Sequence, residues 1–238
     1  MSTLFRELAW QETPIGIISL RQRRILALET DVVEIILGDE HLMSSLFTAS
    51  EIALARIGLD ELEGDNWDVV VGGLGLGYTA DAVLKHDKVS SLTVVELLDP
   101  VVDWHEQGLI PLGIVLTGDE RCRLQRDDFF ALATSPDGFD PKSPGREYDA
   151  ILIDIDHTPD RLLDEGSAGF YSETGLRSLS EHLRQGGVMG LWSDEPPDKR
   201  FTDRLATVFA SARAEPVTFE NPYQPDTPVT QTVYVAMK

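Results

Sequence analysis

The stretch from residue 68 to residue 96, DVVVGGLGLGYTADAVLKHDKVSSLTVVE, constrains the fold more than any other part of the chain. An apolar run leads directly into a glycine-rich turn, a helix-compatible segment follows, and a second apolar run, residues 92–95, ends at Glu96. Glycines allow a sharp turn and a close approach of the backbone to a ligand. This order of elements predicts a nucleotide-binding βαβ unit. The glycines of the turn are Gly72, Gly73, Gly75 and Gly77.

Glu96 is the first candidate ligand-binding side chain. A carboxylate about 20 residues beyond the glycines, at the carboxyl end of the second strand, can accept hydrogen bonds from both hydroxyls of a ribose. The unit therefore predicts a bound nucleoside.

Composition limits the class of protein and the class of partner. The chain has 238 residues, 42% of them hydrophobic, which suits one large domain or a domain with a small appendage. A net charge of −21 argues against a nucleic acid or an anionic membrane as partner. It is compatible with a cationic substrate, and equally with a surface kept soluble by excess carboxylates.

The location is predicted to be cytoplasmic. No apolar run reaches the length of a membrane span, and the first residues, MSTLFRELAWQETP, lack the regions of a signal peptide. The single cysteine, Cys122, excludes an internal disulfide and gives no metal cluster. The histidines at positions 41, 86, 105 and 182 share no spacing and are expected at the surface.

The N-terminal part is predicted to form a small antiparallel meander, residues 1–44, ahead of a nucleoside-binding domain, residues 45–238. Residues 1–12 are expected to be a frayed or edge segment. Three short strands follow, IGIISL, RILAL and VVEIIL, separated at residues 21–24 and 29–31 and ended by Gly38 and Asp39. Residues 45–57 have helical spacing and carry Glu51.

The remainder alternates between helices and strands, which predicts an α/β fold with a doubly wound, mostly parallel seven-stranded sheet and a reversed last strand. We expect helices at 99–107, 166–187 and 201–213, the second of them stopped by Gly186 and Gly187. Strands are expected at 121–125, 148–155 and 188–192, and a terminal hairpin at 217–221 and 229–237.

Carboxylates stand at the ends of two predicted strands, where ligands bind in open α/β sheets. Asp127 and Asp128 can accept a hydrogen bond from an adenine amino group or cap the helix that follows. YDAILIDI runs into Asp154, Asp156 and His157. Asp154 can orient or deprotonate a nucleophile, or can serve as a cap at the strand end.

Together these segments resemble the spermidine synthase (polyamine aminopropyltransferase) family, a branch of the S-adenosylmethionine-dependent methyltransferase fold. The segments that carry the resemblance are the glycine loop, TVVELLDPVV, YDAILIDI, GFYSETGLRSLSEHLRQGGVM and NPYQPDTPVTQTVYVAMK. The resemblance implies Glu96 as ribose ligand, Asp127 at the adenine and Asp154 as the catalytic residue. It also implies acceptor contacts from Glu51, Asp156, His157, Trp192 and Tyr223, no metal, and a homodimer.

The sequence departs from the family pattern at several positions. The family's loop carries an aspartate, which holds the amino end of the donor, where this chain has Gly75. The family's second active-site aspartate is replaced by His157, and its tyrosine and histidine before Glu51 are replaced by Ala49 and Ser50. The family's acceptor-pocket glutamine is also replaced, at a position near Trp192. Recognition of the donor is therefore better supported than a polyamine pocket.

The prediction is a transferase that uses decarboxylated S-adenosylmethionine and moves its aminopropyl group to an amine. A methyltransferase is the first alternative, because the glycine run suits S-adenosylmethionine equally well. Asp154 and Asp156 also resemble the Asp-x-Asp of metal-dependent O-methyltransferases. The Asp-Asn pair that completes the metal site of those enzymes is represented here by Asp194 alone, without the Asn. A non-catalytic nucleoside-binding module is the second alternative.

Overall fold

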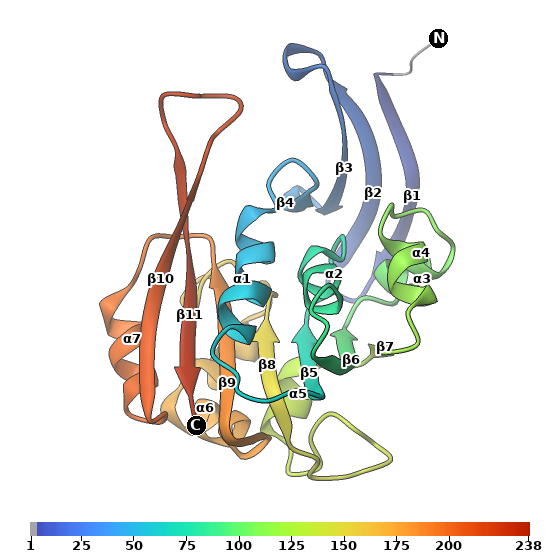
Figure 1. Cartoon of the computed structure of the whole chain (residues 1–238). Coiled ribbons are helices and arrows are strands. Elements are labelled where there is room, and N and C mark those ends of the chain that lie inside the picture. Colours follow the sequence, from blue (N-terminus) through green and yellow to red (C-terminus); the bar gives the residue numbers. More distant parts are fainter. Residues whose placement is uncertain (1–3) are drawn as a thin grey trace.

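The computed structural model describes residues 4–238 and contains two sheets, a four-stranded one above a seven-stranded one (Figure 1). The smaller sheet is antiparallel and follows the chain order β1-β2-β3-β4. The larger sheet has the order β10-β11-β9-β8-β5-β6-β7. Its β5–β9 ladders are parallel, whereas β11 runs antiparallel to both neighbours. The predicted fold class is confirmed.

The N-terminal sheet is longer and more continuous than predicted. Its strands are β1 (Phe5–Thr13), β2 (Gly16–Ile25), β3 (Thr30–Leu37) and β4 (Glu40–Ser44). The predicted break at residues 21–24 is wrong, because Arg23 forms an ion pair with Glu34 of the neighbouring strand at 2.8 Å and the ladder continues. Residues 38–39 do not end the sheet, since they form the turn into β4. Of the predicted edge segment, residues 1–3 lie outside the described part.

Most strands of the large sheet match the predicted segments within a few residues, but those predicted at 188–192 and 217–221 begin earlier, at Leu183 and Ser211, where sheet pairing starts. The strands are β5 (Trp67–Gly72), β6 (Val89–Glu96), β7 (Cys122–Arg126), β8 (Tyr148–Ile153), β9 (Leu183–Ser193), β10 (Ser211–Phe219) and β11 (Val229–Met237). The terminal hairpin extends beyond the sheet toward the N-terminal strands (Figure 1).

Helices cover both faces of this sheet. On one face lie α1 (Ala49–Leu59), α2 (Tyr78–Leu84), α3 (Asp99–Glu106) and α4 (Gly113–Gly118). On the other lie α5 (Phe129–Thr134), the 3-10 helix η2 (Glu165–Tyr171), α6 (Glu173–Glu181) and α7 (Lys199–Ala206). A single-turn 3-10 helix, η1 (Leu26–Leu28), joins β2 to β3.

Two predicted helices are too long. The segment 166–187 is divided at Ser172, whose side chain caps α6, and it ends before the glycines because Leu183 pairs with Tyr148 in the sheet. The segment 201–213 ends at Ala206, since Ser211 pairs with Met237 at the start of the hairpin. In both cases pairing within the sheet overrides local helical spacing.

The core explains why the central strands are uninterruptedly apolar. Val69 and Val71 of β5 pack under α1 and α2, whereas Val70 packs with α5 and α6 on the opposite face. A parallel strand buried on both faces needs apolar residues at every position. The carboxyl ends of β5, β6 and β8 consequently meet at one edge, just below the N-terminal sheet (Figure 1). In the described residues no helix is long and apolar enough to span a membrane.

Candidate active site

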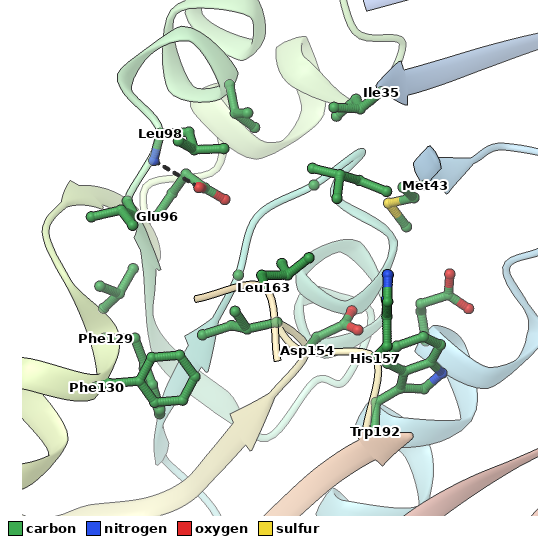
Figure 2. A pocket seen from close by; sticks show the side chains of 18 of the residues that line it. Ile35, Met43, Glu96, Leu98, Phe129, Phe130, Asp154, His157, Leu163 and Trp192 are labelled. Carbon is green, nitrogen blue, oxygen red and sulfur yellow. Dashed lines mark hydrogen bonds between the residues drawn. The ribbon is translucent and has the colours of Figure 1, made fainter. Parts of the chain in front are cut away.

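A pocket lies where the carboxyl ends of the central strands face the N-terminal sheet. We call it the central pocket; its lining includes Gly73, Gly75, Glu96, Asp154, His157 and Trp192. Figure 2 shows Glu96 and Phe130 on one side of Asp154, with Met43, His157 and Trp192 on the other side. The pocket therefore joins residues from distant parts of the sequence.

Two further hollows adjoin the central pocket. The inner pocket shares Glu96, Asp128 and Leu163 with it and extends toward η2. The outer pocket shares Met43, Glu51 and Trp192 with it and extends toward the terminal hairpin, where Phe219 and Gln231 lie. The central pocket thus shares lining residues with a hollow on either side, which offers space for two molecules next to one another.

Gly73 and Gly75 form the floor of the central pocket, and neither position accommodates a side chain. Gly73 has φ of 90°, and a Cβ there would lie 2.1 Å from the carbonyl oxygen of Asp154. Gly75 has φ of 47°, and a Cβ there would lie 2.7 Å from the sulfur of Met43. That sulfur also accepts a hydrogen bond from the Leu76 amide at 3.1 Å.

The other two glycines of the loop do not line the pocket, which differs from the sequence prediction. Gly72 packs against the ring of Phe129, and Gly77 lies at the start of α2 against Leu116. Their small size serves the packing of helices onto the sheet rather than contact with a ligand.

Glu96 is held rigidly between two backbone amides. Oε2 accepts a hydrogen bond from Leu74 N at 2.9 Å, and Oε1 accepts one from Leu98 N at 2.9 Å (Figure 2). Burial raises the pKa of this carboxyl, and the backbone N–H groups partly oppose that change. Glu96 lines both the central and the inner pocket.

Asp128 and Asp127 follow β7 and have separate roles. Asp128 lines both the central and the inner pocket and caps α5, accepting hydrogen bonds from Phe130 N at 2.9 Å and Ala131 N at 3.2 Å. Asp127 is exposed and lines neither pocket, and its carboxylate accepts a hydrogen bond from Asp128 N. The structure thus places Asp128, rather than Asp127, toward a ligand.

Asp154 stands at the end of β8 with a partner that sequence analysis missed. The Thr79 hydroxyl donates a hydrogen bond to Asp154 Oδ2 at 2.6 Å. Burial raises the pKa of Asp154 to about 6, although this hydrogen bond favours the charged form. Burial, and then the nearby charge of Asp154, raise the pKa of Glu51 to about 8. Two carboxyl groups with separated affinities for a proton are typical of acid–base sites.

His157 connects the loop after β8 to the N-terminal sheet. Its Nε2 lies 2.7 Å from Oε1 of Glu40, and its carbonyl oxygen accepts a hydrogen bond from Asp194 N at 2.7 Å. It lines both the central and the outer pocket, as Trp192 does. The two residues therefore lie where the central and outer pockets meet.

Two predicted acceptor contacts lie elsewhere. Asp156 is buried, and its carboxylate accepts hydrogen bonds from Tyr171 Oη at 2.7 Å and Leu163 N at 2.7 Å, so it organises the loop. It lines only the inner pocket and does not converge with Asp154, as a metal-binding pair would. Tyr223 is 47% exposed in the tip of the hairpin, where its ring packs on Phe47.

Several residues in or behind the central pocket carried no recognisable signal in the sequence. Met43 belongs to a strand that was not predicted, and Thr79 is placed only by the packing of α2. His105, expected at the surface, is fully buried with Nε2 2.9 Å from the carbonyl oxygen of Gly75. Burial lowers its pKa, so the neutral ring donates that bond and supports the glycine loop. Within residues 4–238 no group of three or more His, Cys, Asp or Glu could hold a metal ion.

The matched family agrees with this architecture. The family model described as the spermine/spermidine synthase domain matches residues 53–202, more than half of the chain. The chain belongs to the spermine/spermidine synthase family. The match spans the glycine loop, Glu96, Asp128 and Asp154.

Named relatives share the central part of the chain. The polyamine aminopropyltransferase of Bacillus mycoides (strain KBAB4) is 30% identical over 140 residues, 58% of this chain and 44% of that protein. Polyamine aminopropyltransferase 1 of Bacillus anthracis is 29% identical over 140 residues with the same coverage. The matched stretch is therefore less than half the length of these relatives.

Solved structures share the whole fold. Spermidine synthase from Thermotoga maritima has a TM-score of 0.72 and 18% identity, over 98% of this chain and 72% of that one. A spermidine synthase in complex with the transition state analogue AdoDATO has a TM-score of 0.73, 18% identity, and coverage of 98% and 74%. At this identity the likeness concerns the fold.

Proposed function

We propose that this protein transfers the aminopropyl group of decarboxylated S-adenosylmethionine to an amine. Membership of the family and the names of the matched relatives support this reaction class. The row of three pockets supports it as well, because a nucleoside donor and a separate acceptor can meet at Asp154.

The charge of the site is the observation that carries the choice of donor. Among the described residues that line the central and outer pockets, none is lysine or arginine. Carboxyl groups stand there instead, from Glu51, Asp154 and Asp194. The carboxylate of S-adenosylmethionine would have no lysine or arginine to pair with and would meet the charges of Asp154 and Asp194, which is costly in a partly buried site. The decarboxylated donor ends in an ammonium group, which such a site favours.

Each residue then has a defined role. Glu96 accepts hydrogen bonds from the ribose hydroxyls, Asp128 faces the adenine, and the backbone at Gly73 and Gly75 lies along the ribose and the sulfonium. The donor is already activated by its positive sulfur, so the protein mainly aligns the reactants and excludes water. An amine attacks only when neutral, and Asp154 accepts its proton. The new C–N bond forms as the C–S bond breaks, and methylthioadenosine leaves.

Three broader expectations accompany this proposal. The homodimer and the cytoplasmic location stay predictions, and so does the division at residue 44 into a meander and a catalytic domain. The family and the acidic pocket support an amine as the acceptor.

Calorimetric titration with decarboxylated S-adenosylmethionine, S-adenosylmethionine and methylthioadenosine tests the donor. We expect the decarboxylated donor and methylthioadenosine to bind more tightly than S-adenosylmethionine. A preference for S-adenosylmethionine would instead indicate methyl transfer, and binding of none of the three would refute the nucleoside site.

Substitution of the proposed base tests the chemistry. Asp154→Asn should abolish turnover and leave the affinity for methylthioadenosine largely intact, because the amide cannot accept the amine's proton. A variant that keeps wild-type turnover would show that Asp154 is not the base.

A further inference from the structure

The hydroxyl of Ser50 lies between two oxygen atoms that both require its proton. Ser50 Oγ is 2.7 Å from Oε2 of Glu51 and 2.5 Å from Oε1 of Gln231. A serine hydroxyl carries one hydrogen, so it can donate to only one of these two oxygens. In the other short O···O contact the hydrogen must therefore be carried by the partner oxygen, which donates it to Ser50 Oγ.

The orientation of the Gln231 amide is fixed by its other partner. Gln231 Nε2 donates to Oδ1 of Asp194 at 2.7 Å, and Oδ2 of Asp194 accepts a hydrogen bond from Arg161 at 2.9 Å. If the Gln231 amide were flipped, its oxygen would face the Asp194 carboxylate and the two acceptors would repel. The Gln231 oxygen therefore faces Ser50. Gln231 has no proton on that oxygen, and Ser50 therefore donates to Gln231. The remaining contact is satisfied only when Glu51 donates to Ser50.

The surroundings of Glu51 favour the neutral acid. The residue is 8% exposed, and burial together with the charge of Asp154 raises its pKa to about 8. Asp194 adds a smaller repulsion. Tyr78 of α2 also lies near Glu51. The outer pocket contributes two histidines, each of which is paired with a glutamate of the N-terminal sheet. These histidines are His41 and His157.

We propose that Glu51 is a carboxylic acid in the ligand-free protein and releases its proton when an ammonium group enters the outer pocket. The proposal rests on the amine acceptor proposed above and adds how that amine is recognised. The acid and the ammonium ion become a carboxylate–ammonium pair, and one proton passes to the solvent. Glu51 is thus a binding residue for the charged acceptor, and Asp154 remains the base for the attacking nitrogen.

The ionisation of Glu51 can be measured without any ligand. In protein carrying ¹³C-labelled glutamate, one side-chain carboxyl resonance should titrate with a midpoint near 8. That resonance should vanish in Glu51→Gln, whose amide donates to Ser50 as the acid does. It should persist in the control variant Glu63→Gln. Glu63 is an exposed glutamate that precedes the amino end of β5, whereas the pockets lie at the carboxyl ends of the strands. A Glu51 resonance that titrates below about 5 would overturn the proposal.

The release of the proton is measured by calorimetry with putrescine as the probe amine. Experiments at pH 7 in two buffers of different ionisation enthalpy should show release of nearly one proton per putrescine bound. The affinity should rise about tenfold per pH unit from pH 6 to pH 7.5 and level off above 8. Both effects should disappear in Glu51→Gln and remain in His157→Gln, which would show that the released proton comes from Glu51 and not from the imidazole beside it.

The possible outcomes separate the two proposals. Binding of putrescine with no proton release refutes the role of Glu51 and leaves the amine acceptor standing. Absence of putrescine binding to the wild-type protein refutes proton release on binding of this amine and refutes putrescine as the acceptor, even if the Glu51 resonance titrates near 8. Loss of proton release in His157→Gln, with its retention in Glu51→Gln, transfers the effect to the histidine and also overturns the proposal.

Discussion

Removal of the Thr79 hydroxyl should make Asp154 a weaker acid and move the pH dependence of catalysis upward. Thr79 donates to Asp154 Oδ2 at 2.6 Å, and a hydrogen bond to a charged group is worth about 1.5–3 kcal/mol. One pKa unit corresponds to 1.36 kcal/mol, so Thr79→Val should raise the pKa of Asp154 from about 6 to about 7–8. The ionised fraction at pH 7 then falls from about 90% to roughly 10–50%.

The assay is the pH profile of kcat/KM with the decarboxylated donor and an amine. Thr79→Val should lower kcat/KM at pH 7 about two- to tenfold and should recover most of it near pH 9. Thr79→Ser, which keeps the hydroxyl, should retain the wild-type profile, and Thr207→Val provides a matched change at an exposed position beyond α7. A Thr79→Val profile with an unmoved acid limb would show that Thr79 does not set the ionisation of Asp154.

Three further predictions concern stability and the glycine loop. The pKa of Glu51 is about 8 in the folded protein and 4.5 in the unfolded chain, so the unfolded chain loses its proton first. The free energy of unfolding of the wild type therefore falls as pH rises between these two values. Glu51→Gln should therefore be more stable than wild type by a few kcal/mol at pH 8.5, but not at pH 4.5, in urea unfolding. Gly75→Ala should weaken donor binding at least tenfold by calorimetry, and Met43→Ala should restore part of it by removing the clash but not the strain. Tyr171→Phe should cost about 1–3 kcal/mol in urea unfolding and leave kcat unchanged, because the hydroxyl serves the buried Asp156.

Each of these predictions has an outcome that contradicts it. Equal stability differences at both pH values would refute the raised pKa of Glu51. Gly118→Ala is the control for the glycine loop, because a Cβ there meets nothing within 4 Å, and it should leave donor affinity unchanged. Tyr171→Phe with lost turnover and unchanged stability would place its partner in catalysis.

The part of the site that we propose to bind the donor was predictable from sequence, because its residues lie in short, well-patterned segments. The glycine loop, Glu96 and Asp154 all stand at the carboxyl ends of strongly apolar strands, and a parallel sheet brings such ends together. Even there, spacing does not distinguish a glycine that faces the ligand, such as Gly73, from one that packs against a ring, such as Gly72. That distinction depends on which helix lies behind the strand.

The outer pocket was predictable only in part. Glu51, His157 and Trp192 were named from the sequence and line it, but its other contacts are long-range and its elements are weakly patterned. The N-terminal strand that carries Met43 was missed, since a two-residue turn after Leu37 has the composition of a terminus. Ser50 and Gln231 are separated by 181 positions and meet only after α1 packs against the terminal hairpin. Asp156 had the expected residue type at nearly the expected position, but its hydrogen bonds show that it holds a loop.

The family match covers the residues of the site unequally. The family match begins at residue 53 and ends at residue 202, which leaves out Met43, Glu51 and Gln231. These residues border the outer pocket, whereas the matched segment supplies Glu96 and Asp154. Met43 occupies the space that a side chain at position 75 would fill, so the glycine and the methionine are one compensated arrangement. The outer pocket is therefore built jointly, from His157, Trp192 and Asp194 of the matched segment and from elements that lie outside it.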